Sequence, residues 1–302
     1  MPPDIQNLTD IKSKAEGLKV VYISLYCYNS FPIRIFHRLS LNASVDSHTF
    51  FLKDSYANQH SPLSQSELDL LAGAIEEIDP DLIAISILAP YVDTAQKVVA
   101  RLRTVSQAPI VGGGKFPTVN PAGALEFLDY ACRGEGELAL LEAFSRLGGG
   151  KDLSGVKGLW RRDADGNLVD GGMQRLIQDL DAIPTPAVAL PGMYFIENDS
   201  LTKQDPLAVH PVIMVMASRG CVYQCTFCVN SLLAPMNRGN GKFVRIRTPE
   251  SIVDEIEKRV ALIPPESRKS TVIHFLDEVF GVIPDWTVEF TKLYKSRVGL
   301  PF

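Results

Sequence analysis

Apolar positions in the first half of the chain follow two alternating spacings. Short continuous apolar runs are typical of strands buried on both faces of a parallel sheet, and they alternate with stretches in which apolar residues recur at helical intervals. This alternation indicates an α/β fold with a doubly wound parallel sheet. The predicted strands are 18–25, 47–52, 82–88, 109–111 and 129–132, and the predicted helices are 64–78, 93–105, 121–128 and one that begins at Glu137.

The rest of the chain predicts two further parts. Residues 149–208 contain a small hairpin with an Asp165-Gly166 turn, followed by a proline-containing linker. We therefore expect three segments, 18–148, 149–208 and 209–302, the last being the start of a (β/α) barrel. Within that segment the predicted strands are 211–217 and 271–276, the predicted helices are 249–262 and 285–297, and 298–302 leads toward a third strand.

Composition narrows the class of protein. The chain has 302 residues, of which 46% are hydrophobic and 22% charged, with a net charge of −5. These values are typical of a globular protein of about two domains, and they argue against a basic surface for nucleic acid. No apolar run approaches the roughly 20 residues that span a bilayer, and residues 1–10 lack the pattern of a signal peptide. We therefore expect a cytoplasmic protein with no membrane segment.

Three of the five cysteines stand close together in the sequence. Cys221, Cys225 and Cys228 have the spacing C-x3-C-x2-C, which indicates metal ligands and not disulfides. Three thiolates can hold three irons of a [4Fe-4S] cluster and leave the fourth iron open, whereas a closed cluster or a structural zinc takes four protein ligands. The alternative is a zinc site that His210 or His274 completes.

The cysteine segment resembles the cluster motif of the radical S-adenosylmethionine (SAM) enzymes. The resemblance implies a [4Fe-4S] cluster whose open iron binds SAM and whose reduced form cleaves SAM to a 5′-deoxyadenosyl radical. Phe227 matches the aromatic residue common before the last cysteine, while Val222 replaces a frequent proline. Asp277-Glu278-Val279-Phe280 resembles the D-[DE]-x-F element of this family, which implies that Asp277 or Glu278 pairs with the SAM amino group.

Two glycine-containing loops follow predicted strands of the first domain. Each has an ordinary interpretation as a tight turn, and each would also let a backbone approach a ligand closely. In order and spacing they resemble the cobalamin-binding domain that precedes many radical SAM barrels, which implies a flavodoxin-like sheet. The residues that this resemblance implies for cobalamin binding are Gly112, Gly113, Gly114, Thr118, Gly134, Glu135 and Gly136.

One motif of methyl-carrying cobalamin proteins is absent. Their D-x-H-x-x-G loop, whose histidine binds cobalt, is replaced after the first strand by residues 26–30. We interpret His48 as an ordinary strand-edge residue, and Cys27 and Cys132 as small buried apolar residues. Cobalamin binding and its loss in this chain therefore both stay open.

These features together predict a radical SAM enzyme of the cobalamin-binding class. Its reaction would be radical methyl transfer or rearrangement of an unidentified small molecule, with electrons from a flavodoxin or ferredoxin. The alternative is a non-catalytic cobalamin or small-ligand sensor with a residual metal site. Because only two βα units follow Cys221, we expect the chain to be the N-terminal part of a longer enzyme or a truncated product.

Overall fold

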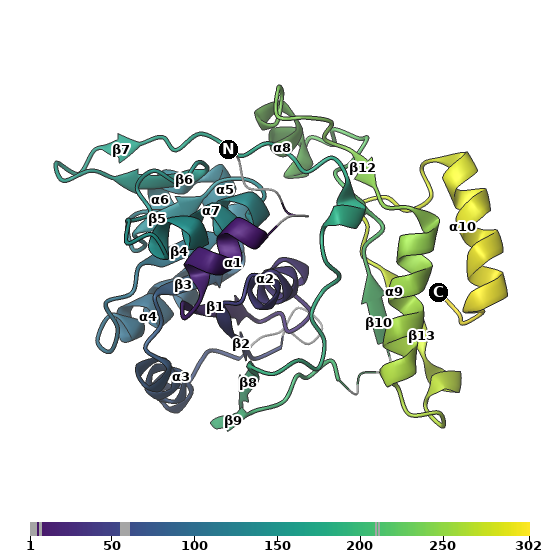
Figure 1. Cartoon of the computed structure of the whole chain (residues 1–302), viewed down its shortest axis with the longest axis horizontal. Helices are drawn as coiled ribbons and strands as arrows, with labels where there is room; N and C mark the ends of the chain where they lie inside the picture. Colours follow the sequence, from purple (N-terminus) through teal and green to yellow (C-terminus); the bar gives the residue numbers. More distant parts are fainter. Residues whose placement is uncertain (1–4, 6–7, 55–60, 209, 211) are drawn as a thin grey trace. The chain divides into compact units, whose positions relative to one another are not determined.

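Figure 1 shows a computed structural model that describes residues 5, 8–54, 61–208, 210 and 212–302. The chain divides into two compact units, Met1–Gln174 with Pro186–Asp205, and Arg175–Thr185 with Pro206–Phe302. Among the described residues, no helix has both the length and the apolar character that crossing a membrane requires.

The first unit is built on a nine-stranded sheet of the described residues. Strand β1 (Lys19–Leu25) lies inside it, hydrogen-bonded in parallel to β2 (Asp46–Leu52) and β3 (Leu82–Ser86). Strands β4 (Ile110–Gly113) and β5 (Tyr130–Cys132) continue the parallel sheet beyond β3. The resulting order 2-1-3-4-5 is that of a flavodoxin-like sheet, which confirms the predicted doubly wound fold. Such a sheet binds ligands at the carboxyl ends of its strands, where β1 and β3 lead in opposite directions.

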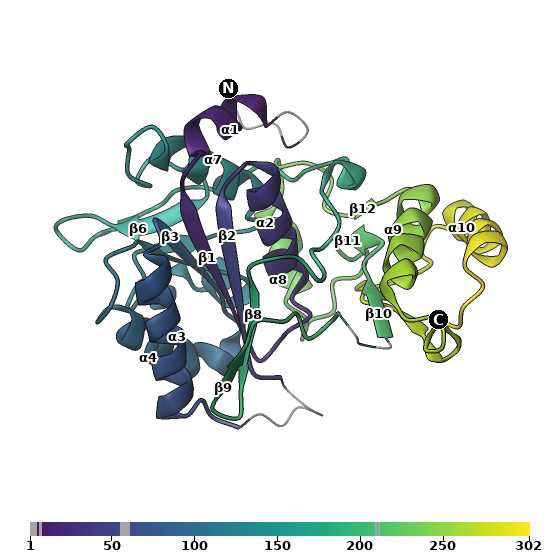
Figure 2. The same ribbon diagram turned by 60° about the horizontal axis from the view of Figure 1, so that its bottom comes forward.

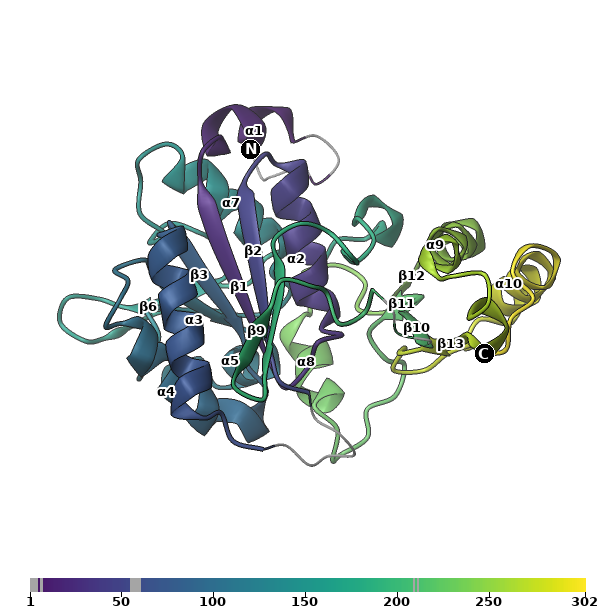
Figure 3. The ribbon, with the colours of Figure 1, turned by 90° about the horizontal axis from the view of Figure 1, so that it is seen from below.

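Helices cover both faces of this sheet (Figure 3). Ile75 and Val98, from α3 and α4, lie in the core on one face, and Ile33 and Leu141, from α2 and α7, lie in the core on the other. Helix α3 begins at a capping box in which Ser64 and Glu67 bond to each other's backbone N–H, as the sequence predicts for Ser64. The helices of this unit are α1 (Thr9–Ala15), α2 (Phe31–Asn42), α3 (Gln65–Ile78), η1 (Ala89–Tyr91), α4 (Val92–Leu102), α5 (Lys115–Val119), α6 (Pro121–Ala124) and α7 (Glu137–Leu147).

Four further strands widen the sheet at its two edges. The hairpin of β6 (Leu159–Arg162) and β7 (Leu168–Val169) pairs antiparallel with β5. At the other edge, β8 (Met193–Glu197) runs parallel to β2 and β9 (Ser200–Thr202) turns back on β8. The sequence predicts the hairpin, but it gives residues 149–208 as a connecting segment and not as part of the sheet. The prediction misses β8 because this short strand is stabilised by a partner far away in the sequence.

The second unit contains two short sheets. Strands β10 (Val212–Val215) and β13 (Val272–Phe275) pair in parallel, and β11 (Ser218–Arg219) pairs antiparallel with β12 (Arg245–Ile246). Helix α9 (Pro249–Leu262) connects the second pair to β13. This arrangement is that of βα units placed side by side, as expected for the start of a (β/α) barrel.

Helices pack over these strands. Figure 2 shows α9 and α10 (Pro284–Arg297) beside each other, and residues of both helices share one core with Ile213 of β10. Thr248 caps α9 by accepting the Ser251 N–H, with Pro249 in the first turn, as the sequence predicts. The remaining helices of the unit are η2 (Leu180–Ala182), α8 (Asn230–Met236) and η3 (Arg268–Ser270).

Residues 298–302 form no strand, as expected for a turn, and the Ile273 N–H of β13 donates to the Pro301 carbonyl at 2.9 Å. One expectation for the second unit differs from the structure. His274, expected from its apolar neighbours to be packed, has an exposed side chain. It occupies an outward-facing position of β13, where side chains alternate between the two faces.

Candidate functional site

The cysteine loop begins at the carboxyl end of the β10–β11 segment. Gly220 precedes the first cysteine and has a φ of 86°, a conformation that favours glycine. A Cβ at Gly220 would lie 2.3 Å from the Phe243 carbonyl oxygen, so only glycine allows this close approach. The sequence therefore fixes the backbone at the entry to the loop.

The three cysteine thiols are accessible and free of disulfides. Cys225 is exposed, while Cys221 and Cys228 are half-buried. The Cys228 N–H donates to the Cys225 carbonyl at 2.9 Å, which closes a turn between these two residues. Neighbouring Phe227 is 93% exposed, so it packs on nothing in its own unit. Thiolate donors suit an iron–sulfur cluster or zinc.

The thiols do not converge on one point. Among the described residues, no group of three or more His, Cys, Asp or Glu side chains has a geometry that could hold a metal ion. The two histidines proposed for a zinc site do not complete one there: His210 Nδ1 accepts the Val212 N–H at 3.1 Å, and His274 is exposed. The spacing of the cysteines thus brings three donors into one loop without arranging them as ligands.

Asp277 follows β13 and reaches the base of the cysteine loop. Its carboxylate accepts the Ala217 N–H at 3.0 Å and the Ser218 hydroxyl. Burial raises the pKa of Asp277 above its usual value, and the hydrogen bonds from Ser218 and Ala217 oppose this rise. Glu278 is exposed. Of the two acids in this motif, Asp277 is therefore engaged by the backbone next to the cysteines, and Glu278 is the one that reaches solvent.

Thr118 links the two glycine loops of the first unit. Its side chain, which is 4% exposed, donates to the Gly114 carbonyl at 2.8 Å and accepts the Gly134 N–H at 3.2 Å. The backbone carbonyl of Thr118 also accepts a bond from Arg133 Nε at 3.2 Å. The loops that follow β4 and β5 are therefore held together at the carboxyl edge of the sheet, as their common resemblance requires.

Different structural constraints apply to the individual glycines of these loops. Gly114 and Gly134 have φ values of 98° and 91°, which other residues adopt only with strain. A Cβ at Gly112 would lie 2.2 Å from Leu128 Cδ1, so Gly112 makes room for core packing. A Cβ at Gly136 would lie 2.7 Å from Phe36 Cζ. Gly113 has room for a side chain, and half-buried Glu135 lies in the turn between Gly134 and Gly136.

The loop after β1 occupies the place of the missing histidine motif. Tyr26 has a φ of 53°, an unusual backbone for a tyrosine that indicates strain held by its surroundings. The half-buried Cys27 thiol donates to Asn29 Oδ1 at 2.8 Å, and burial raises the pKa of Cys27 to about 11. This thiol therefore stays protonated at neutral pH. Cys132 is buried, as expected, and burial raises its pKa to about 12.

His48 lies away from this edge. Its ring contacts the Tyr194 hydroxyl at 3.3 Å and Asp46 at 3.2 Å, near the amino end of β2. The carboxyl ends of the strands, where ligands bind, are at the opposite edge. The structure thus places His48 among the residues of a strand and not at the glycine loops.

Two residues that the sequence analysis did not single out lie next to the candidate sites. Arg34 of α2 is 1% exposed and donates from Nε to the Tyr28 carbonyl at 2.8 Å, which fixes the loop after β1. Asn230 is 3% exposed, and its Nδ2 is buried without a hydrogen-bond partner among the described residues. A buried amide donor without a partner costs free energy. The position of Asn230, two residues after Cys228, was the only available signal.

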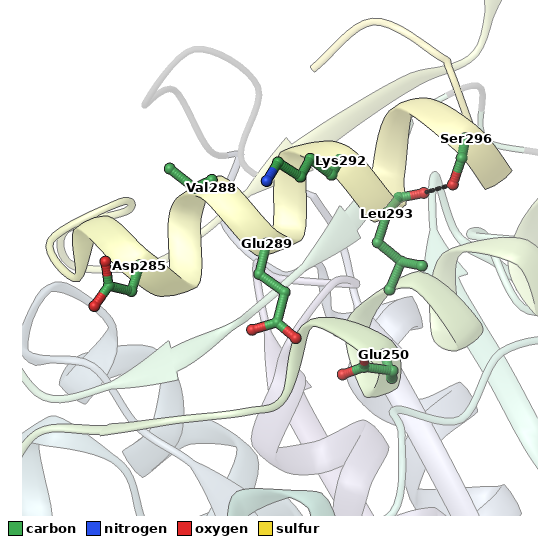
Figure 4. A pocket seen from close by; sticks show the side chains of 7 residues that line it. All are labelled: Glu250, Asp285, Val288, Glu289, Lys292, Leu293 and Ser296. Atoms are coloured by element: carbon green, nitrogen blue, oxygen red, sulfur yellow. Dashed lines mark hydrogen bonds between the residues drawn. The ribbon is translucent and has the colours of Figure 1, made fainter.

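A groove of about 560 Å³ lies elsewhere in the second unit, between α9 and α10 (Figure 4). None of the cysteines lines it. Of its lining residues, Ser296 donates from Oγ to the Leu293 carbonyl at 2.8 Å, a hydrogen bond within α10. This groove is therefore separate from the cysteine loop. Its lining residues are Glu250, Asp285, Val288, Glu289, Lys292, Leu293 and Ser296.

Comparison with known proteins shows a family match in the first unit and similar proteins over most of the chain. Residues 50–144 match the B12 binding domain family, a range that includes both glycine loops. An uncharacterized methyltransferase of Pyrococcus horikoshii is 29% identical over 231 residues, which cover 75% of this chain and 46% of that protein. The anaerobic magnesium-protoporphyrin IX monomethyl ester cyclase of Cereibacter sphaeroides is 30% identical over 200 residues, 63% of this chain and 30% of that protein.

These similarities support a radical SAM protein of the cobalamin-binding type. Its fold agrees with that of the radical SAM methyltransferase TsrM from Kitasatospora setae, in a structure with cobalamin and a [4Fe-4S] cluster bound. The TM-score is 0.66 at 18% identity, covering 93% of this chain and 53% of that chain. The chain spans less than half the length of these two curated relatives. The fold that the sequence predicts is confirmed.

Proposed function

We propose that this chain holds a [4Fe-4S] cluster and SAM for a radical reaction that also uses cobalamin. The observation that carries the proposal is the C-x3-C-x2-C loop itself, with three accessible thiols at the carboxyl end of one parallel strand. The adjacent strand ends in a carboxylate that bonds to the base of the same loop. Barrel enzymes place their chemistry at this end of their strands.

Each residue of the cysteine loop has a distinct role in this proposal. Cys221, Cys225 and Cys228 would hold three irons, which leaves the fourth iron for SAM. When bound and reduced, the cluster supplies the electron that cleaves SAM to a 5′-deoxyadenosyl radical. Asp277 orients the loop through the Ala217 N–H and the Ser218 hydroxyl. Exposed Glu278 would accept a hydrogen bond from the SAM amino group, and exposed Phe227 would pack on the bound SAM.

The first unit fits a corrin at the carboxyl edge of its sheet. The turns that contain Gly114 and Gly134 present backbone atoms at this edge, because these two residues have no side chain. Thr118 joins the two turns by hydrogen bonds. Gly112 and Gly136 permit the packing behind these turns, while Gly113 and Glu135 complete them. The Cys27 thiol, protonated and bonded to Asn29, is no ligand for cobalt. The corrin would then meet this unit without a metal ligand from the loop after β1.

The reaction class follows from the relatives. These relatives are a methyltransferase and a cyclase by name, so we propose radical methyl transfer or rearrangement of a small molecule. A flavodoxin or ferredoxin would supply the electron, and the cytoplasm would be the compartment. We further propose that residues 18–148 form the cobalamin-binding part, 149–208 the connection and 209–302 the cluster-bearing part.

Iron analysis of cysteine variants tests this proposal. The protein would be reconstituted anaerobically with iron and sulfide, and Cys225→Ala compared with Cys27→Ala as a matched control. We expect about four irons per chain in the wild type and in Cys27→Ala, and a loss of most iron in Cys225→Ala. Equal iron content in both variants would refute the assignment of the cluster to this loop.

A further inference from the structure

The segment Arg175–Thr185, here named the strap, belongs to the second unit although the residues on both sides of it belong to the first. From the sequence it is a proline-stiffened linker without chemistry of its own. A linker would make few contacts with either unit. The strap instead makes a series of hydrogen bonds and an ion pair within the second unit.

The first half of the strap bonds to the backbone of residues 240–242. The Leu176 N–H donates to the Asn240 carbonyl at 2.7 Å. Gln178 Oε1 accepts the Lys242 N–H at 3.0 Å, and its Nε2 lies 3.5 Å from the Lys242 carbonyl. Gly241 has a φ of 119°, and a Cβ there would lie 2.3 Å from Gln178 Nε2. The Gln178 amide therefore fits closely against the backbone beside it.

The strap also holds the end of β12, through Ile177 and Asp181. Arg245, which is 6% exposed, donates from Nη1 to the Ile177 carbonyl at 2.9 Å. Asp181 accepts the Thr248 N–H at 2.9 Å and pairs with Arg247 Nε at 3.5 Å. Burial would raise the pKa of Asp181, but its hydrogen bonds with Ser251 and Thr248 hold that pKa below its usual value. The carboxylate is therefore charged at neutral pH.

The segment that the strap holds is the one that holds the cysteine loop. Strand β12 pairs with β11, and the Arg247 N–H donates to the Ala217 carbonyl at 2.8 Å. The Phe243 carbonyl lies against Gly220, the residue before the first cysteine. Residues 243–247 thus have the strap on one side and the base of the cysteine loop on the other.

We propose that the strap positions the cysteine loop, with Gln178 and Asp181 as its positioning residues. Neither residue touches a cysteine, and both act through residues 240–248. The inference rests on the proposed function for its importance, because a loop whose thiols must bind three irons depends on a fixed base. Releasing the strap would loosen Cys221 most, since Cys221 directly follows the Gly220 contact.

Thiol alkylation of the reduced, metal-free full chain tests the strap independently of any cluster. Each cysteine would be followed by mass spectrometry in the wild type, Gln178→Ala, Asp181→Ala and the exposed strap control Arg175→Ala. We expect alkylation of half-buried Cys221 to rise by about fivefold to tenfold in the two strap variants, the effect of losing about one hydrogen bond. Cys225 is already exposed and should change little.

The conservative variants Gln178→Glu and Asp181→Asn keep an acceptor for Lys242 and Thr248, and should restore most of the wild-type rate. Buried Cys132 reports unfolding of the first unit, and half-buried Cys228 reports unfolding of the second. A parallel rise at Cys132 or Cys228, or equal rates in Gln178→Ala and Arg175→Ala, would overturn the proposal.

A second readout uses the reconstituted protein. Iron release to a chelator should be about tenfold faster in Gln178→Ala than in Arg175→Ala, because the loop that holds the metal opens more often. Equal release rates would overturn the role of the strap in holding the cluster. If the wild type takes up no iron while Cys221 still responds to Gln178→Ala, the proposed function fails and the strap inference stands.

Discussion

Replacement of Thr118 by valine tests whether the two glycine loops act as one site. Valine keeps the shape of the side chain, so the core contacts of this 4% exposed residue are preserved. The hydroxyl is lost, and with it the acceptor for the Gly134 N–H. The Gly114 carbonyl still accepts the backbone N–H of residue 118 at 3.2 Å. The perturbation is therefore confined to the link between the loops.

The size of the effect follows from this single lost bond. A buried donor without a partner costs about 1–2 kcal/mol, which corresponds to roughly tenfold in an equilibrium constant. We expect the Gly134 amide to exchange about tenfold faster and the affinity for hydroxocobalamin to fall about tenfold in Thr118→Val. Thr118→Ser is the matched control: it keeps the hydroxyl and loses one methyl group, about 1 kcal/mol of stability.

Hydrogen exchange and absorbance titration with hydroxocobalamin measure these effects. The serine variant should bind the corrin as the wild type does, although its stability is reduced by a similar amount. Equal affinities for the valine and serine variants would refute the reasoning, because stability alone would then explain both results.

Three further changes test other parts of the structure. Asp205→Asn leaves the buried Arg34 without its anionic partner, so the free energy of unfolding in urea should fall by about 3 kcal/mol, and a loss below about 1 kcal/mol would contradict this. Burial lowers the pKa of His37 from 6.5 to about 4, so on acidification the unfolded chain binds the proton before the folded chain does. The free energy of unfolding should therefore fall by up to about 3 kcal/mol as the pH drops from 6.5 to 4. His37→Phe should flatten this dependence, and an unchanged slope would disprove the assignment. Gly220→Ala should reduce the iron content after reconstitution about tenfold, because its Cβ would clash with a backbone carbonyl. The control Gly239→Ala, at a φ of 85° with open space around it, should keep the wild-type iron content. Similar iron contents in the two variants would argue against a crowded loop entry.

The elements that the sequence predicts well are those whose pattern is complete within one segment. The capped helix after Ser64 and the buried run at 82–86 carry both their periodicity and their end signals locally. Helix α2 was missed because Phe31, Ile33 and Ile35 are two positions apart, which is the spacing of a strand. Within this helix the buried Arg34 bonds to Asp205, a partner that is far away in the sequence.

The candidate site shows the same division. The cysteines and the glycine loops were predicted because their residue types and spacing carry the signal. Two hydrogen bonds of the site depend instead on which strands become neighbours. They are the bond between Thr118 and the Gly134 N–H and the bond between Asp277 and the Ala217 N–H. The strap was predicted as a plain linker because hydrogen bonds from its backbone and from Gln178 leave no trace in composition or periodicity.

The most direct test of the account is EPR of the reconstituted, dithionite-reduced full chain, recorded with and without SAM. We predict a [4Fe-4S]⁺ signal that changes when SAM is added, because three cysteines leave one iron open for it. The change should be lost in Glu278→Ala, whose carboxylate is assigned to the SAM amino group, and kept in Glu289→Ala on the distant face of α10. A cluster signal indifferent to SAM, or zinc in place of iron, would contradict the account.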